Sequence, residues 1–244
     1  MVFKKLFGVL GAGGASVDTV LTGSDYQPGA IMSGEVHVET TRDAIVVGRV
    51  TLVGVITSPN SPHTHEFGRF NVAHRFPVTR HDTVTHPLTF ELPWETPLTS
   101  LPGLETSEVT VGVKTELAID NGVDQTDLDP LSITPLPAQH GLLVGLSELN
   151  YRVEHNNINQ GHLARTEQTL PFFQHLSFQH RASHKRLHIG CVATHDTLDV
   201  LLELGDGSGL TRGGGSTHQF RVRHDEAARV PWANELSRWL HEPR

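Results

Sequence analysis

Histidine is the residue type in this chain with the clearest capacity for chemistry, because imidazole binds metal ions and exchanges protons near neutral pH. The sequence holds 17 histidines, six before residue 135 and eleven after it, against only four lysines. His63 and His65 are two apart, a spacing that points both rings to one side of a strand. His180, His184 and His188 are four apart. Either spacing is compatible with a shared metal ion.

Several features favour a plainer interpretation of the histidines. A four-residue spacing gathers side chains on one side of a helix, but His188 lies in an apolar, alternating segment that is typical of a strand. No His-Glu-x-x-His pair, no cysteine ligand spacing and no matching carboxylate accompanies these residues. We therefore expect surface histidines, no bound metal and no cofactor. A metal-dependent enzyme that uses the histidines is the alternative function.

Other catalytic patterns are weak. The sequence has no Gly-x-Ser-x-Gly motif, and Cys191 lies among apolar residues, which predicts a buried and unreactive thiol. Glu91 and Glu95 flank Pro93-Trp94, but no cleft is evident for such a carboxylate pair. Six glycines within 205–216 stand between two predicted strands and lack the lysine of a phosphate-binding loop, so we expect a hairpin loop. The chain is not expected to be an enzyme.

Composition limits the remaining function classes. The net charge is −8 over 244 residues, which argues against binding to a nucleic-acid backbone. A single cysteine fits a reducing compartment, and no apolar run of 18 residues predicts a membrane span, so we expect a cytoplasmic protein. Residues 82–134 hold ten acidic residues and one basic residue. We expect a solvated acidic face there, and docking of a basic partner is the alternative.

Alternating apolar residues dominate the chain from residue 16 onward, as in β-strands. Tyr26-Gln27-Pro28-Gly29 predicts a type II turn, because proline fixes φ at its second position and glycine accepts a positive φ at its third. The predicted strands are Ser16–Thr22, Ile31–Glu39, Ala44–Thr57, Thr64–Ala73, Thr83–Leu92, Glu108–Ile119, Leu146–His155, Leu170–Gln179, Arg186–Thr194, Thr197–Leu204 and Thr217–His224.

The prolines and aspartates of Asp127–Pro137 interrupt regular structure, and we place a domain boundary there. The two resulting domains, residues 1–134 and 135–244, each have the size of a β-sandwich. Helices do not alternate with these strands, which excludes a parallel nucleotide-binding sheet. The predicted fold class is all-β, with two antiparallel sandwiches in tandem.

Amphipathic spacing predicts a short helix at each end. At the N-terminus, Lys4 and Lys5 precede an apolar run as in a secretory signal, but the glycines at 11, 13 and 14 break this run early, which favours a retained helix. This helix either packs on its own domain or docks on a partner or a membrane surface. Pro231 opens a C-terminal helix that we expect to cover a sheet, with an exposed docking stripe as the alternative. The apolar positions are Phe3, Leu6, Phe7 and Leu10 at one end and Trp232, Leu236, Trp239 and Leu240 at the other.

Several short segments together resemble the bacterial sporulation-control proteins, a family with an arrestin-like fold. The most specific is Phe90-Glu91-Leu92-Pro93-Trp94-Glu95-Thr96-Pro97; the others are Phe3–Phe7, Val17–Thr19, Tyr26-x-Pro28-Gly29, Gly34–Val36, Val113–Asp120, Leu170–Phe172 and Val200–Glu203. The resemblance covers most of the chain. It implies two arrestin-like β-sandwiches, a cytoplasmic regulatory role in sporulation or cell-envelope development, and no catalytic activity.

Together these observations predict a non-enzymatic cytoplasmic regulator or adaptor that binds protein partners, including other copies of itself. Sheet edges, the acidic stretch and the N-terminal helix are the expected contact surfaces. A peripheral membrane scaffold held by that same helix is a further alternative. The candidate partner-binding residues are Phe3, Lys4, Lys5, Leu6, Phe7 and Leu10, and the candidate polar contacts between the domains are Asp18, Lys114 and Glu116.

Overall fold

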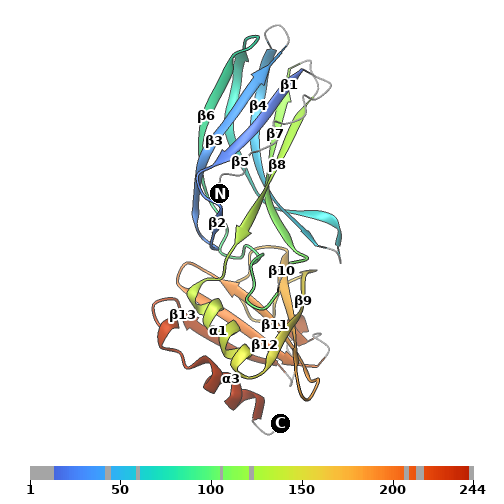
Figure 1. Cartoon of the computed structure of the whole chain (residues 1–244), viewed down its shortest axis with the longest axis vertical. Coiled ribbons are helices and arrows are strands. Elements are labelled where there is room, and N and C mark those ends of the chain that lie inside the picture. Colours follow the sequence, from blue (N-terminus) through green and yellow to red (C-terminus); the bar gives the residue numbers. More distant parts are fainter. Residues whose placement is uncertain are drawn as a thin grey trace.

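The computed structural model describes residues 14–41, 45–58, 61–104, 107–120, 124–205, 209–212 and 217–241. Within this part, strands predominate and form three sheets. Figure 1 shows a long β-sandwich stacked end to end on a shorter unit of sheet and helices. We call β1 to β8 the N-terminal sandwich, and β9 to β13 with the helices the C-terminal unit.

The N-terminal sandwich packs a three-stranded sheet, in the order β1-β3-β6, on a five-stranded sheet, in the order β2-β8-β7-β4-β5. Every pair is antiparallel except the two-residue pairing of β2 with β8. The strands are β1 Ala15–Leu21, β2 Asp25–Tyr26, β3 Ile31–Thr40, β4 Ile45–Ser58, β5 Ser61–Val78, β6 Thr83–Glu91, β7 Thr110–Ile119 and β8 Gln125–Ile133.

The turn that precedes β3 has the predicted geometry. Ala30 N donates to Gln27 O at 3.0 Å, which closes the four-residue turn, and Gly29 has φ of +76°. These are the marks of a type II turn with proline second and glycine third. The predicted roles of Pro28 and Gly29 are therefore confirmed, and the turn spans Gln27–Ala30, one residue later than the quoted Tyr26–Gly29.

The segment from residue 127 to 133 is a strand and not the irregular linker that its prolines and aspartates predicted. Pro130 lies within β8, opposite Gly112 of β7. On its other side β8 pairs only through Ser132 and Ile133 with β2, so the missing N–H of Pro130 breaks no ladder bond. The division at residues 134 and 135 stays a prediction, and β8 ends at Ile133, just before it.

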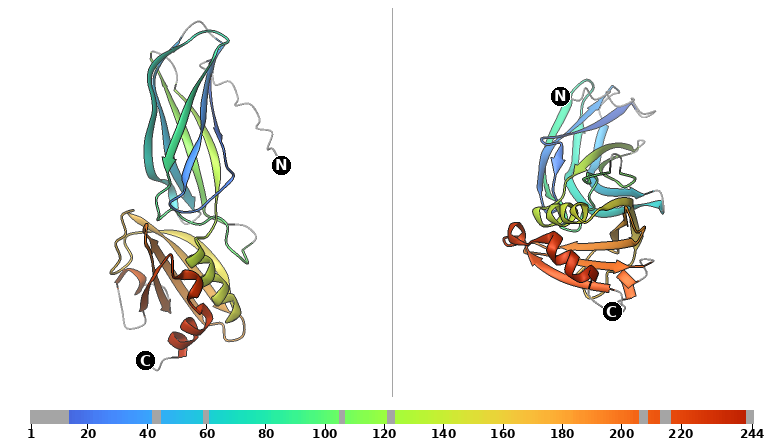
Figure 2. Two further views of the ribbon diagram at one scale, coloured as in Figure 1. Left: turned by 90° about the vertical axis from the view of Figure 1, so that its left-hand side faces the viewer. Right: turned by 60° about the horizontal axis from the view of Figure 1, so that its bottom comes forward.

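The C-terminal unit contains one five-stranded antiparallel sheet, in the order β13-β12-β11-β10-β9. Figure 2 shows helices α1 and α3 lying together over one face of it. The antiparallel all-β prediction is thus confirmed, but in the described part of this unit helices form the layer that a second sheet was expected to provide. The strands are β9 Tyr151–Gln160, β10 Phe172–His180, β11 Arg186–Ala193, β12 Thr197–Leu204 and β13 Thr217–Arg223.

The helices are α1 Pro137–Glu148, α2 Gly209–Arg212 and α3 Trp232–His241, with a 3-10 turn at Ala227–Arg229. Every predicted strand overlaps an observed one, although residues 146–148 of the segment predicted as Leu146–His155 belong to α1. The C-terminal helix is confirmed and packs on α1 through its buried Trp232. A Cβ at Gly141 would stand 2.3 Å from Nε1 of that indole, so α1 and α3 approach closely because α1 has a glycine there.

The glycine-rich stretch connects β12 to β13, its antiparallel neighbour, as the predicted hairpin loop requires, and it contains α2. The predicted N-terminal helix, with Phe3, Lys4, Lys5, Leu6, Phe7 and Leu10, lies outside the described residues. Among the helices that the structure describes, none is long and apolar enough to cross a membrane.

Candidate functional site

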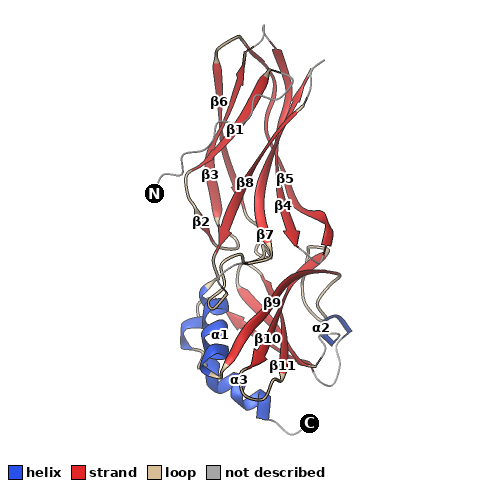
Figure 3. Cartoon of the chain, turned by 45° about the vertical axis from the view of Figure 1, so that its right-hand side comes forward, coloured by secondary structure: helices blue, strands red, loops and turns tan. Residues whose placement is uncertain are grey.

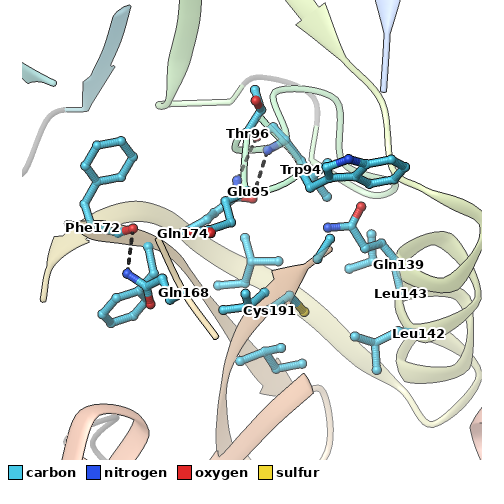
Figure 4. Close-up of a pocket in the computed structure, with 16 residues that line it drawn as sticks. Trp94, Glu95, Thr96, Gln139, Leu142, Leu143, Gln168, Phe172, Gln174 and Cys191 are labelled. Atoms are coloured by element: carbon cyan, nitrogen blue, oxygen red, sulfur yellow. Dashed lines mark hydrogen bonds between the residues drawn. The ribbon is translucent and has the colours of Figure 1, made fainter. Parts of the chain in front are cut away.

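The segment that follows β6, from Leu92 to Leu98, enters the junction between the N-terminal sandwich and the C-terminal unit. Figure 4 shows Trp94, Glu95 and Thr96 above the C-terminal sheet, with α1 beside them. One contiguous cluster of buried apolar side chains extends from Ala15 of β1 to Leu236 of α3. The two units therefore share a core and are not merely tethered by a linker.

Glu95 fastens this segment to the loop between β9 and β10. Its Oε1 accepts hydrogen bonds from Thr169 N at 2.7 Å and Thr169 Oγ1 at 2.6 Å, and its Oε2 accepts from Leu170 N at 3.0 Å. Bonds to an ionised carboxylate are stronger than those between neutral groups. Both oxygens of Glu95 are engaged, so this carboxylate acts as a clamp and is poorly placed for acid–base catalysis.

Gln168 shapes the loop that Glu95 holds. Its Oε1 accepts from Leu163 N at 2.8 Å, and its Nε2 donates to Leu170 O at 2.6 Å and Phe172 O at 3.0 Å. Figure 4 shows the last of these bonds. Gln168 thus fixes the conformation of the loop, and the backbone N–H groups of this loop donate to Glu95.

A second set of bonds surrounds Leu98. Its N–H donates to Gln174 Oε1 at 2.9 Å, and its carbonyl oxygen accepts from Gln174 Nε2 at 2.7 Å. Gln174 Nε2 also donates to Asn156 Oδ1 at 2.8 Å, and Asn156 Nδ2 donates to Ser107 Oγ at 2.9 Å. Gln174 lies on β10 and Asn156 on β9. Two strands of the C-terminal sheet thus supply the hydrogen-bond network that satisfies the backbone N–H and carbonyl groups of Leu98.

Aromatic contacts complete the junction at its two sides. Trp94 stacks on His224 with ring centroids 5.6 Å apart and meets His195 edge-on at 5.7 Å. His224 donates from Nε2 to Thr194 O at 2.9 Å. On β5, the buried His65 packs on Phe172 at 5.1 Å and accepts at Nδ1 from Gln160 Nε2 at 3.2 Å. His65 is a structural contact between the units.

The cavity at this junction is small. Its volume is about 30 Å³, and it lies between Trp94–Leu98, the α1 side chains Leu142 and Leu143, and residues of β10 and β11. This volume suits one or two water molecules and no larger ligand. Cys191 lines it, and burial first, then the charge of Asp199, raises the pKa of its thiol to about 12. The prediction of an unreactive thiol agrees with this environment.

The predicted polar contacts between the domains lie within the sandwich. Lys114 Nζ donates to Glu116 Oε1 at 2.9 Å on β7, and Arg69 of β5 donates to Glu116 Oε2 at 3.0 Å. The Lys114 ammonium, and then Arg69, lower the pKa of Glu116. Asp18 lies on β1 opposite His37. None of these recorded pairs joins the two units.

The structure does not bring His180, His184 and His188 together as a group. His180 accepts from Ser183 N in the β10–β11 turn, where His184 has φ of +55°. His188 instead meets His175 across the strands, with His175 Nε2 2.9 Å from His188 Nδ1. Among the described residues, no group of three or more histidines, cysteines or carboxylates has the arrangement of a metal site.

A larger hollow lies between α3 and β13, the outer strand of the C-terminal sheet. Its volume is about 470 Å³, within the range of small-molecule sites. Apolar and aromatic side chains line it, and charged residues stand at its rim. The apolar lining is Leu202, Phe220, Val222, Val230, Pro231, Leu236 and Trp239, and the charged residues are Arg221, Glu226, Arg229 and Glu235.

Sequence reasoning did not identify Glu95, Gln174 or Asn156 as contacts between the two units. The signal available for Glu95 was its place in Phe90–Pro97, the segment most specific to the family resemblance. For His175, the available signal was the register of the β10–β11 hairpin. That register pairs Ser177 with His188 and so places His175 diagonally across from it.

Comparisons with known proteins agree with this architecture. The profile of the family described as SpoOM protein matches residues 3–206. The sporulation-control protein spo0M of Bacillus subtilis (strain 168) is 28% identical over 213 residues, which are 83% of this chain and 80% of that protein. The crystal structure of Spo0M, sporulation control protein, from Bacillus subtilis matches with a TM-score of 0.79 at 22% identity, over 93% of this chain and 98% of that chain. The chain therefore shares the fold of this family member, as the resemblance predicted, with helices in place of a second sheet in the described part of its C-terminal unit. The family profile covers most of its length, and the chain belongs to the SpoOM protein family.

Proposed function

We propose that this chain is a non-enzymatic regulator that acts in the cytoplasm by binding a protein partner. Its family includes a sporulation-control protein, which supports a regulatory role. The observation that carries the proposal is that Trp94 and Glu95 contact the C-terminal unit. They are the most chemically distinctive residues of the Phe90–Pro97 segment. Both make contacts that hold the two units together, and the cavity beside them has room for water alone.

The hollow between β13 and α3 is the proposed docking site. Its occupant is an extended segment of the partner, because among the described strands β13 pairs with β12 alone, and a sheet edge of this kind can accept a further strand. Phe220 and Val222 lie on the face of β13 that borders the hollow, and Trp239 of α3 lines the hollow as well. An apolar side chain of the added strand would enter between these groups. The N-terminal residues Phe3 to Leu10 are the second proposed contact.

Photo-crosslinking in cells tests this proposal on the full chain. A photoreactive phenylalanine analogue replaces Trp239 in one variant and Ile31, which is 71% exposed on the N-terminal sandwich, in the control. We expect a discrete crosslinked protein product from position 239 and none from position 31. Excess unmodified chain should compete for this product, and the Trp239→Asp variant should not.

Three outcomes would contradict the proposed site. Identical products from both positions would show non-specific capture, no discrete product from position 239 would leave the hollow without a partner, and equal competition by Trp239→Asp would show that the hollow does not contribute. Circular dichroism of Trp239→Asp confirms that it is folded before it is used. Deletion of residues 1–13 then measures the contribution of the N-terminal residues, and vesicle co-sedimentation measures their membrane affinity.

A further inference from the structure

The turn between β10 and β11 concentrates positive charge at one exposed place. Residues 180–186 contain Arg181, Lys185 and Arg186 together with two histidines and no acidic residue, in a chain whose net charge is −8. Arg152 of β9 joins them, because β10 places it in the same cross-strand row as Arg186. All four basic residues are exposed. We call Arg152, Arg181, Lys185 and Arg186 the basic tip.

Hydrogen bonds hold the turn in one conformation. The Arg181 N–H donates to Asn150 O at 3.0 Å, which ties the turn to the loop after α1. The His184 N–H donates to His180 O at 3.0 Å, and the Ser183 N–H donates to His180 Nδ1 at 3.0 Å. An ordered turn loses less conformational entropy on binding than a loop that has to become ordered first. The basic side chains therefore extend from a backbone that is already arranged.

The charges of the basic tip are only weakly neutralised within the described part of the chain. Arg181 and Lys185 form no ion pair with a described residue, and Arg186 meets Glu154 at 3.5 Å. Arg152 donates to an uncharged side-chain amide. By contrast, arginines elsewhere form ion pairs of 2.7 to 3.0 Å with carboxylates; these are Arg69, Arg221, Arg223 and Arg238. The basic tip thus has charge available for an external anion.

The basic tip lies at the end of the C-terminal unit that is remote from the N-terminal sandwich. β10 starts at Phe172, which packs on His65 of the sandwich, and ends in the turn at His180. Its nine residues span about 30 Å. Figure 3 shows the C-terminal unit extending away from the junction.

This separation keeps the tip positive in a chain that is acidic as a whole. Charges in water are screened from each other beyond about 10 Å at 0.1 M salt, so the acidic residues of the sandwich do not cancel the field at the tip. Even with Glu154 counted, and with Glu148 at the end of α1, the four basic side chains outnumber these carboxylates.

We propose that the basic tip is an electrostatic contact for the anionic surface of a phospholipid bilayer. Guanidinium and ammonium groups pair well with phosphate oxygens. A projecting turn reaches a flat surface, whereas a peptide ligand needs a groove or a sheet edge. End-on contact would bring the basic side chains to the lipid phosphates and hold the acidic sandwich more than a screening length away. This contact goes beyond the proposed function and is independent of the hollow beside α3.

Vesicle co-sedimentation of the full chain tests this proposal. We expect no binding to phosphatidylcholine vesicles. Vesicles that contain about one third phosphatidylglycerol should bind the chain, and this binding should fall steeply as salt is raised from about 0.05 M to about 0.3 M. Each basic residue near an anionic surface contributes about fivefold in affinity, so the double variant Arg181→Gln/Lys185→Gln should bind about tenfold more weakly or worse.

The matched control is Arg49→Gln/Arg80→Gln, which removes the same charge from exposed positions of the N-terminal sandwich and should bind as the wild type does. Circular dichroism first shows that each variant is folded. Poly-glutamate is the soluble probe for the other class of partner, and its binding to the wild type and to Arg181→Gln/Lys185→Gln is measured without vesicles.

Four results would overturn the proposal. The first is that the wild type does not bind the phosphatidylglycerol vesicles. The second is equal binding by the wild type and Arg181→Gln/Lys185→Gln, which would assign the contact to other residues such as Lys4 and Lys5. The third is an equal loss in the control variant, which would show an effect of net charge alone. The last is tip-dependent binding of poly-glutamate that is tighter than vesicle binding, which would assign the tip to an acidic protein segment.

Discussion

The indole of Trp94 lies directly against the backbone of Gly29, so that a Cβ added at residue 29 would stand 2.4 Å from Cε2 of that ring. Gly29 also has φ of +76°, a conformation that glycine adopts without strain. The turn before β3 thus supports the tryptophan whose ring then contacts His195 and His224 of the C-terminal unit. Gly29 therefore lets the turn before β3 pack closely against the tryptophan that contacts the C-terminal unit.

Gly29→Ala is expected to lower the free energy of unfolding by about 3 kcal/mol or more, from backbone strain together with displacement of the indole. Gly103→Ala is the matched control, because Gly103 has φ of +82° with no atom within 4 Å of its added Cβ. That variant should lose only the strain, about 1–2 kcal/mol. Urea unfolding measures both, and equal losses would show that the contact with Trp94 contributes nothing.

Glu95→Gln is expected to destabilise the chain by about 2 kcal/mol, because an amide can accept at one position only and turns an N–H donor toward another donor. Hydrogen exchange gives the specific readout, since the amides of Thr169 and Leu170 should lose protection while those of β7 keep it. Glu91→Gln changes an exposed carboxylate on the same segment and serves as the control. Unchanged protection at residues 169 and 170 would contradict the role of Glu95 as a clamp.

Gly141→Ala should destabilise the chain by about 2 kcal/mol, although alanine favours an isolated helix over glycine by about 1 kcal/mol. The reason is the 2.3 Å separation between the added Cβ and Trp232 Nε1. In a Trp232→Leu background this clash is removed, so the same substitution should become neutral or stabilising. A double-mutant cycle measures the coupling, and additive effects would contradict direct packing of α1 on α3.

The strands, the type II turn and the C-terminal helix followed from local patterns, whereas α1 and the junction did not. Helix α1 has glycines at 141 and 145, which count against a helix in the sequence and are explained only by Trp232, a residue far along the chain. Similarly, Glu95 finds its partners at Thr169 and Leu170. Contacts between such distant residues leave no periodic signal.

The polar contacts predicted between the domains illustrate the same limit. Asp18, Lys114 and Glu116 were candidates for charges in the interface between the domains, and the sequence assigned no pairs among them. Alternation settles the direction of Lys114 and Glu116: Val113, Thr115 and Leu117 are buried, so the charged residues between them face outward on β7. There Glu116 accepts from both Lys114 and Arg69. The groups that do join the two units are mainly uncharged amides, such as Gln174 and Asn156, which composition does not single out.

The stability of the chain is expected to fall on acidification from pH 6.5 to pH 4 because of His175. Burial first, then His188 and His155, lower the pKa of His175 from 6.5 to about 4 in the folded state. Between these values the unfolded chain binds a proton that the folded chain does not, so lowering the pH favours unfolding, by about 3 kcal/mol at most. His175→Gln removes this titration. The free energy of unfolding of this variant, measured with urea, should depend less on pH than that of the wild type. The control is His81→Gln, which replaces an exposed histidine and should keep the pH dependence of the wild type. Equal pH dependence of the wild type and His175→Gln would show that His175 titrates alike in the folded and unfolded states.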